Sequence, residues 1–225
     1  RDPAETTGYW LSLGVAVGIA SLGLVLNSTA VVIGAMLIAP LMTPIVALAM
    51  GLAVGSPFLV LRSVGRVLAS IVCAVAGSAA LTRSLPFHEL TTELAARTTP
   101  TALDLLTAAF CAVAGAYAAL RPGSNTAATA AGTSIGISLV PPLCTSGYGV
   151  GVGNWVVAKG AALLFVANLS AIVVVGSVIF TAAGFHRVDV ATLERQQIER
   201  GSGARVARAA SRALSSIFST PGGFI

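Results

Sequence analysis

The fold class is decided by the stretch Val31-Val-Ile-Gly-Ala-Met-Leu-Ile-Ala-Pro-Leu-Met-Thr-Pro44, an apolar run that two prolines interrupt. A similar stretch follows in the second half, Thr133-Ser-Ile-Gly-Ile-Ser-Leu-Val-Pro-Pro-Leu-Cys-Thr-Ser146. Aligned without gaps, the two share the pairs Ile33/Ile135, Gly34/Gly136, Leu37/Leu139, Pro40/Pro142, Leu41/Leu143 and Thr43/Thr145. Proline inside a helix removes a backbone donor and frees a carbonyl one turn earlier. The repeated stretch therefore predicts two helices broken in the same way.

Composition predicts that these helices lie in a membrane. Charged residues make up 9% of the chain, apolar types make up 56%, and the mean hydropathy is +0.90. A water-soluble domain carries about 25% charged residues. Apolar runs near the length of ~20 residues that crosses a bilayer cover residues 9–26, 28–54, 59–81, 102–120, 126–150 and 155–182. These runs are too long for barrel strands, so we predict an all-α polytopic membrane protein with six transmembrane helices.

The six spans divide into two groups of three, with a proline-broken helix in the middle of each group. A unit with an odd number of spans ends on the side opposite to its start, so a second copy enters the membrane upside down. We therefore predict two inverted three-helix repeats, with chance similarity between apolar segments as the alternative. The expected parts are an N-terminal end (1–8), the first repeat (9–84), an extracytoplasmic linker (85–101), the second repeat (102–183) and a basic tail (184–225).

Arginine placement predicts the orientation in the membrane, because basic residues near span ends favour the cytoplasm. One side receives most of them, and we expect both termini to be cytoplasmic in a bacterial inner membrane. The net charge of +5 then reflects topology and anionic lipid rather than nucleic-acid binding. In the tail, Arg205, Arg208 and Arg212 predict either an amphipathic helix on the membrane surface or a solvated segment. Because the chain starts at Arg1, we expect that a preceding domain is missing.

The two breaks predict a central binding site. From the start of each span, Pro40 lies about 18 Å and Pro141 about 22 Å into a ~30 Å hydrocarbon core. Half-helix ends there would expose N–H and C=O groups to a solute. The candidate solute-binding residues are Gly34, Pro40, Thr43, Pro44, Thr133, Ser134, Ser138, Pro141, Pro142, Thr145 and Asn168. The alternative is that prolines, small residues and hydroxyls only shape helix packing, which also applies to Gly14 and Gly18.

Other kinds of chemistry find no support in the residues. No Asp, Glu or His lies near the centre of a predicted span, which disfavours a buried proton relay. We expect no enzyme, no catalytic residue, no metal and no cofactor, because no nucleophile has a base nearby and no cluster of metal ligands exists. For Arg62, Arg66 and Lys159 near span ends, snorkelling to the interface is the default interpretation, and an entrance for anions is the alternative.

The string Ser28-Thr-Ala-Val-Val-Ile-Gly-Ala-Met-Leu-Ile-Ala-Pro-Leu-Met-Thr-Pro-Ile45 resembles the bacterial membrane family catalogued as domain of unknown function 389. The string Ser138-Leu-Val-Pro-Pro-Leu143 is similar to the second signature of that family. The resemblance covers roughly residues 9–182. It implies a multi-pass membrane domain, often accompanied by a soluble domain, and leaves the activity open.

Two functions from different classes follow. The first is a transporter or channel-like protein for a small solute or ion, bound at the paired breaks near the middle of the bilayer. Exposed N–H groups favour an anionic or neutral solute, while exposed carbonyls suit a cation. The second is a membrane scaffold or sensor that signals to a missing soluble domain. We expect a homo-oligomer in the lipid bilayer in either case.

Overall fold

The described part of the chain folds into eight α-helices. The computed structural model describes residues 3–86, 89–120 and 125–184, and the side chains of 7–86, 89–120 and 139–184. These residues belong to one unit, Arg1–His186, and contain no strand. The helices are α1 (Pro3–Val25), α2 (Thr29–Ile38), α3 (Met42–Val54), α4 (Pro57–Ser84), α5 (Thr92–Ala95), α6 (Ala102–Leu120), α7 (Asn125–Val152) and α8 (Trp155–Ala182). The all-α prediction is confirmed, and the predicted basic tail lies outside the described residues.

Helix length and apolarity agree with a multi-pass membrane protein. Among the described residues, four helices are long and apolar enough to cross a bilayer: Thr7–Val25, Pro57–Ser84, Ala102–Leu120 and Trp155–Ala182. A fifth span is obtained if α2 and α3 count as one bent pair. α7 has 28 residues, and part of its side chains lies outside the described set. The count of six spans therefore stays a prediction.

The first predicted break is confirmed between α2 and α3. Helix α2 ends at Ile38, and the next residue, Ala39, has extended backbone angles of φ −66° and ψ 121°. The ring of a following proline clashes with a helical residue before it, so Pro40 forces Ala39 out of the helix. The chain resumes as α3 at Met42, at an angle of 59° to α2. Pro44 is tolerated because it lies in the first turn of α3.

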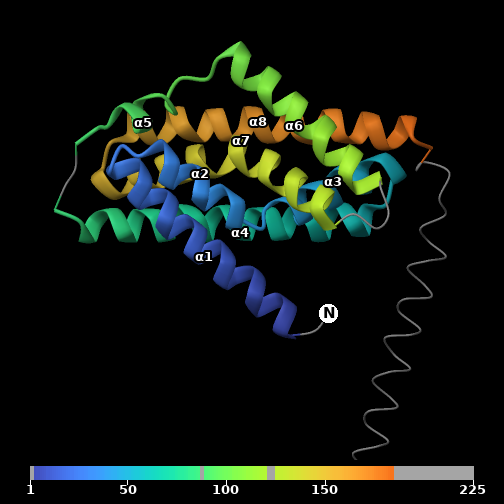
Figure 1. Cartoon of the computed structure of the whole chain (residues 1–225), viewed down its shortest axis with the longest axis horizontal. Coiled ribbons are helices and arrows are strands. Elements are labelled where there is room, and N and C mark those ends of the chain that lie inside the picture. Colours follow the sequence, from blue (N-terminus) through green and yellow to red (C-terminus); the bar gives the residue numbers. More distant parts are fainter. Residues whose placement is uncertain (1–2, 87–88, 121–124, 185–225) are drawn as a thin grey trace, which may run out of the picture. The chain divides into compact units, whose positions relative to one another are not determined.

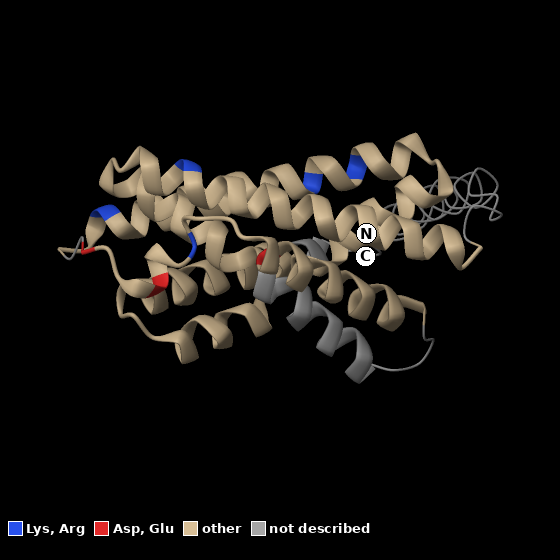
Figure 2. Cartoon of the chain, turned by 90° about the horizontal axis from the view of Figure 1, so that it is seen from above, with Lys and Arg blue, Asp and Glu red and all other residues tan. Residues whose placement is uncertain are grey.

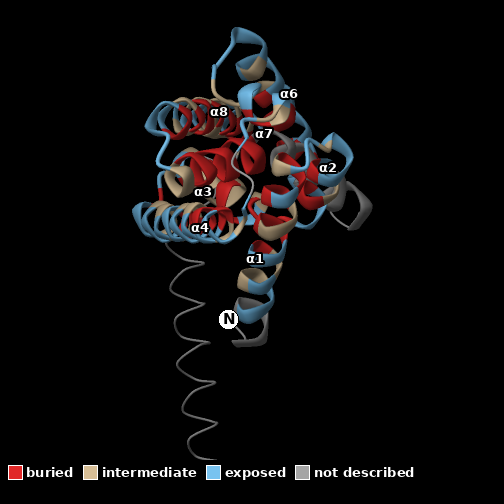
Figure 3. Cartoon of the chain, turned by 90° about the vertical axis from the view of Figure 1, so that its left-hand side faces the viewer, coloured by how far each residue is buried: buried red, intermediate tan, exposed pale blue. Residues whose placement is uncertain are grey.

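The second predicted break is wrong, because α7 runs through Pro141 and Pro142 as a single helix. Both prolines lack an amide donor, yet neighbours enclose this part of α7. Every residue from Leu139 to Gly149 is buried, and α7 packs against α1, α2, α3, α4, α6 and α8. Figure 3 shows this buried centre between α4 and α8. Tertiary packing holds the helical path where the local chemistry alone favours a break.

The third helix of the first half, α4, and the third helix of the second half, α8, run in opposite directions (Figure 1). Figure 1 shows α4 and α7 running in one direction and α8 returning beside them, while α1 and α6 cross at a slant. The third helix of each half starts in the same manner. Gly55 and Gly153 have left-handed φ values of 73° and 80°, which glycine adopts without strain. The next residues, Ser56 and Asn154, then cap α4 and α8 by accepting a hydrogen bond from a first-turn amide.

Helix α5 ties the linker between the halves to the turn between α1 and α2. The Asn27 side-chain oxygen accepts hydrogen bonds from the Thr92 hydroxyl at 2.8 Å and the Glu93 amide at 3.0 Å. The Thr91 hydroxyl donates to the Leu24 carbonyl at 2.7 Å. Leu94 is fully buried at 0% exposure. The predicted linker therefore packs onto the end of the bundle.

Candidate binding site at the helix break

A recess lies directly after the break, between α3 and α4. Its volume is about 170 Å³, and its walls are Thr43, Pro44, Ala47, Leu59, Arg62, Ser63 and Arg66. A cavity of 10 to 15 Å³ in the same measure holds about one water molecule. The break therefore adjoins enough space for a small hydrated solute or ion.

The first turn of α3 forms one wall of this recess and supplies backbone donors. The residue before the helix is Leu41, whose side chain makes no capping hydrogen bond. Amides in a first helical turn have no acceptor within the helix, and they carry the positive end of the helix dipole. Pro44 has no amide hydrogen, so Met42 and Thr43 are the donors of this turn. The end of α3 at the recess is therefore electropositive.

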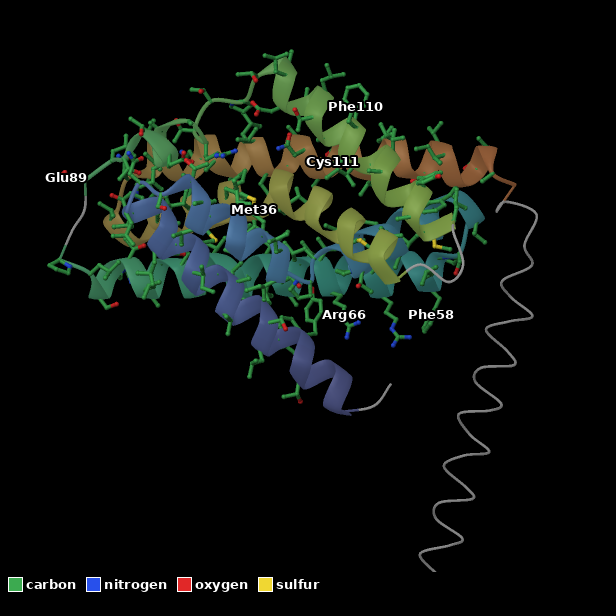
Figure 4. The ribbon with its side chains drawn as sticks, in the orientation of Figure 1. Met36, Phe58, Arg66, Glu89, Phe110 and Cys111 are labelled. Atoms are coloured by element: carbon green, nitrogen blue, oxygen red, sulfur yellow. The ribbon has the colours of Figure 1, made fainter. Side chains whose placement is uncertain are left out.

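The opposite wall is one face of α4. Leu59, Arg62, Ser63 and Arg66 are three or four residues apart and therefore lie on the same side of the helix. The Arg66 guanidinium lies 5.2 Å from the centre of the Tyr9 ring on α1. Figure 4 shows the Arg66 side chain projecting from α4 on the side away from α7 and α8. Two cationic groups thus stand within one turn on a single face.

No carboxylate neutralises these two arginines within the described part of the chain. The ion pair found there joins Arg97 to Glu93 at 3.8 Å. Glu93 lies on α5, and Arg97 lies just after it. Figure 2 shows that charged positions are sparse along the helices and that acidic ones lie in the left half of that view. Among the described side chains, Arg62 and Arg66 therefore give the recess a positive charge that no carboxylate compensates.

Ser63 adds a buried hydroxyl to the same wall. Its residue is 5% exposed, and among the described residues its hydroxyl has no hydrogen-bond partner. Two other hydroxyls of α4 behave differently, because Ser70 and Thr82 donate to carbonyls one turn earlier. The Ser63 oxygen is not among the fully enclosed side-chain atoms that lack a partner, so it keeps accessible surface on the recess that it lines. Ser63 therefore provides a vacant donor and acceptor in the recess.

The predicted site residues divide between this recess and the protein interior. Thr43 and Pro44 line the recess, whereas Gly34 lies on α2 and Pro40 within the break, each half-buried. Buried elsewhere, and absent from the recess walls, are Pro141, Pro142, Thr145 and Asn168. The side chains of Thr133, Ser134 and Ser138 lie outside the described residues. The structure does not bring both predicted breaks into this recess.

From the sequence, Arg62 and Arg66 were considered only as an alternative entrance for anions, and Ser63 was missed. The usable signal was the spacing of two arginines and a serine on one helical face, combined with the short Gly55-Ser56 turn. A short turn places successive helices side by side as neighbours, so α4 had to pack next to α3. That argument puts this face of α4 near the first turn of α3.

The described part of α7 serves helix packing. The Ser21 hydroxyl donates to the Ser78 hydroxyl at 2.9 Å, and Ser78 donates to the Cys144 carbonyl at 2.8 Å. A Cβ atom added at Gly147 would lie 2.6 Å from the Ser78 Cβ. Such close contacts show that small residues of the described stretch let α7 approach α4 closely. Within the described residues, no group of three or more His, Cys, Asp or Glu residues forms a metal site.

Long apolar helices, one of them bent at a proline beside a charged recess, define the class: a multi-pass helical membrane protein. A family model described as "Domain of unknown function (DUF389)" matches residues 36–174, and the chain belongs to this family.

One relative is "Uncharacterized protein MJ0678" from Methanocaldococcus jannaschii, which is 32% identical over 174 residues. The match covers 77% of this chain and 53% of the relative, so the chain spans about half the length of that protein. The relative is archaeal, so it lends no weight to the expected bacterial source. No solved structure matches the chain.

Proposed function

We propose that this protein is a transporter or channel-like protein that binds a small solute or ion at the break between α2 and α3. The observation that carries the proposal is the recess at that break, which opens at the surface of a bundle of apolar helices. Helix ends exposed at membrane depth are the usual ligand-binding devices of transporters. The proposal includes no enzymatic reaction, and it assumes a homo-oligomer in the membrane.

We also retain the inverted duplication as part of this proposal. Its support is the opposite directions of α4 and α8 in Figure 1 and the matching starts of these two helices, which both have 28 residues. The proposed duplication is asymmetric in function, because only the first middle helix is broken. Transport then depends on the first half, with α7 as the buried support against which it moves.

A membrane scaffold or sensor is the second candidate function. The observation that favours it is the close packing of α4 on α7, where a Cβ at Gly151 would lie 2.9 Å from the Ala79 carbonyl. Such contacts hold the halves together without any solute. A scaffold would keep these contacts fixed, whereas a transporter must shift some of them.

Flux into proteoliposomes separates the two functions. The panel contains small anions, cations and neutral polyols, and it compares the wild type with Pro40→Ala. Because Pro40 forces the break, this substitution favours a continuous helix and is expected to alter selective flux. Pro57→Ala is the control, since Pro57 lies at the first position of α4, where proline is tolerated. Absence of flux from folded wild-type protein across the whole panel would favour the scaffold or sensor.

A further inference from the structure

We infer that the recess between α3 and α4 binds a phosphate-type oxyanion, held by Arg62, Arg66, Ser63 and the first-turn amides of α3. The inference rests on the proposed function and names its class of solute. Two separate elements converge on the recess, and the polar side chains that line it are two arginines, which only donate, and the hydroxyls of Thr43 and Ser63, which can donate and accept. A cation would find no carboxylate among the described residues that line it.

The two arginines of α4 provide the positive charge that favours an anion. Arg62 and Arg66 are four residues apart, and like charges at this spacing repel each other. No described carboxylate lies within an ion-pair distance of either one. Tyr9 offers Arg66 a ring face, which attracts a cation but leaves its N–H groups free to bind an anion. An oxyanion between the two arginines would relieve this repulsion and accept from both guanidinium groups.

The first turn of α3, across the recess from the arginines, provides further hydrogen-bond donors. The first turn of α3 starts at Met42 without a side-chain cap, so its amides are available to an anion. Ser63 adds a different kind of donor, because it is only 5% exposed, bonds to no described group and keeps its hydroxyl accessible on the recess. A tetrahedral oxyanion has enough acceptor positions for two guanidinium groups, one hydroxyl and the helix amides together.

At the depth of the recess, the phosphate group that binds can come from either of two sources. Arg62 lies about 8 Å and Arg66 about 14 Å along α4 from its first residue, which places them from the interface inward. A free phosphate ion and the phosphate of a lipid headgroup both reach this depth. The chemistry of the ligand is shared, and the experiment separates the sources.

The test measures binding of radiolabelled inorganic phosphate to purified protein in nanodiscs of zwitterionic lipid. The Arg62→Gln/Arg66→Gln double variant is expected to weaken binding at least about tenfold, because it removes two charge-assisted donors. Ser63→Ala is expected to weaken it about threefold. Arg83→Gln is the matched control, since it removes one exposed charge at the other end of α4 and should leave binding within about twofold. Arg62→Lys/Arg66→Lys keeps the charge and should restore part of the binding.

A second arm adds anionic phospholipid and measures retained lipid by native mass spectrometry. If the ligand is a headgroup, the wild type and Arg83→Gln retain anionic lipid, and the double variant loses it. The inference is overturned if the double variant binds both phosphate and lipid like the wild type, or if the folded wild type binds neither. Phosphate binding without flux supports the inference and overturns the transport proposal. Flux of a cation or polyol without phosphate binding supports the transport proposal and overturns the inference that the recess binds an oxyanion.

Discussion

At the scale of single residues, the structure separates glycines that permit close packing from glycines that do not. A Cβ added at Gly147 would lie 2.6 Å from the Ser78 Cβ and 2.8 Å from the Val75 carbonyl oxygen. At Gly14 nothing lies within 4 Å of an added Cβ. The sequence predicts packing roles for Gly14 and Gly18, and within the described residues neither position makes such a close approach.

Gly147→Ala should therefore destabilise the protein. The added methyl group forces α7 away from α4, and overpacking of this kind costs about 1 to 3 kcal/mol. Thermal unfolding in detergent measures the change. Gly14→Ala is the control and should leave the unfolding temperature unchanged or slightly higher. Equal effects of the two substitutions would contradict the assignment of Gly147 to the contact between α4 and α7.

At the scale of elements, most helices could be predicted from the sequence. The apolar runs at 102–120 and 155–182 match α6 and α8, and the chemistry of Pro40 was sufficient to place the first break. The continuity of α7 could not be predicted, because it depends on burial by six other helices rather than on Pro141 and Pro142. Of the two walls of the recess, the sequence predicted the α3 wall but not its pairing with α4. Thr43 follows from the break, but the pairing of its helix with Arg62 and Arg66 depends on how α4 is rotated against α3.

Helix α5 provides a prediction at this scale, because the Asn27 side chain makes two of the hydrogen bonds that hold it to the bundle. Asn27→Gly keeps the left-handed backbone, for which φ is 54°, and removes the acceptor of two hydrogen bonds. We expect faster hydrogen exchange of the amides of residues 91–97, by about tenfold for each ~1.4 kcal/mol of lost local stability. Asn154→Gly is the control, because it removes a cap of α8 and does not contact α5. Unchanged exchange in Asn27→Gly would show that other contacts hold α5.

At the scale of the whole molecule, helix directions (Figure 1) and arginine placement together predict an orientation in the membrane. Alternating helix directions place the starts of α1 and α4 towards one end of the bundle and the start of α8 at the other (Figure 1). Arginine placement predicts that the first of these ends faces the cytoplasm. Membership of the family fixes neither orientation nor activity, so both must be measured.

Cysteine labelling tests the orientation. In a Cys73→Ser background, Phe58→Cys lies near the start of α4 and Ser84→Cys at its end, and both positions are exposed. An impermeant maleimide added outside intact cells should label Ser84→Cys and spare Phe58→Cys. The native Cys111 and Cys144 are buried and should not react. The opposite labelling pattern would invert the predicted topology, and labelling of both positions would contradict a span at α4.

The central claim is that the recess beside the α2–α3 break binds the transported solute. Uptake of radiolabelled phosphate into proteoliposomes tests it most directly, with the wild type, Arg62→Gln/Arg66→Gln and Arg83→Gln reconstituted at equal density. The account predicts saturable uptake by the wild type and Arg83→Gln, and uptake at least about tenfold slower in the double variant. Equal uptake by all three proteins, or no uptake by folded wild-type protein, would contradict the claim.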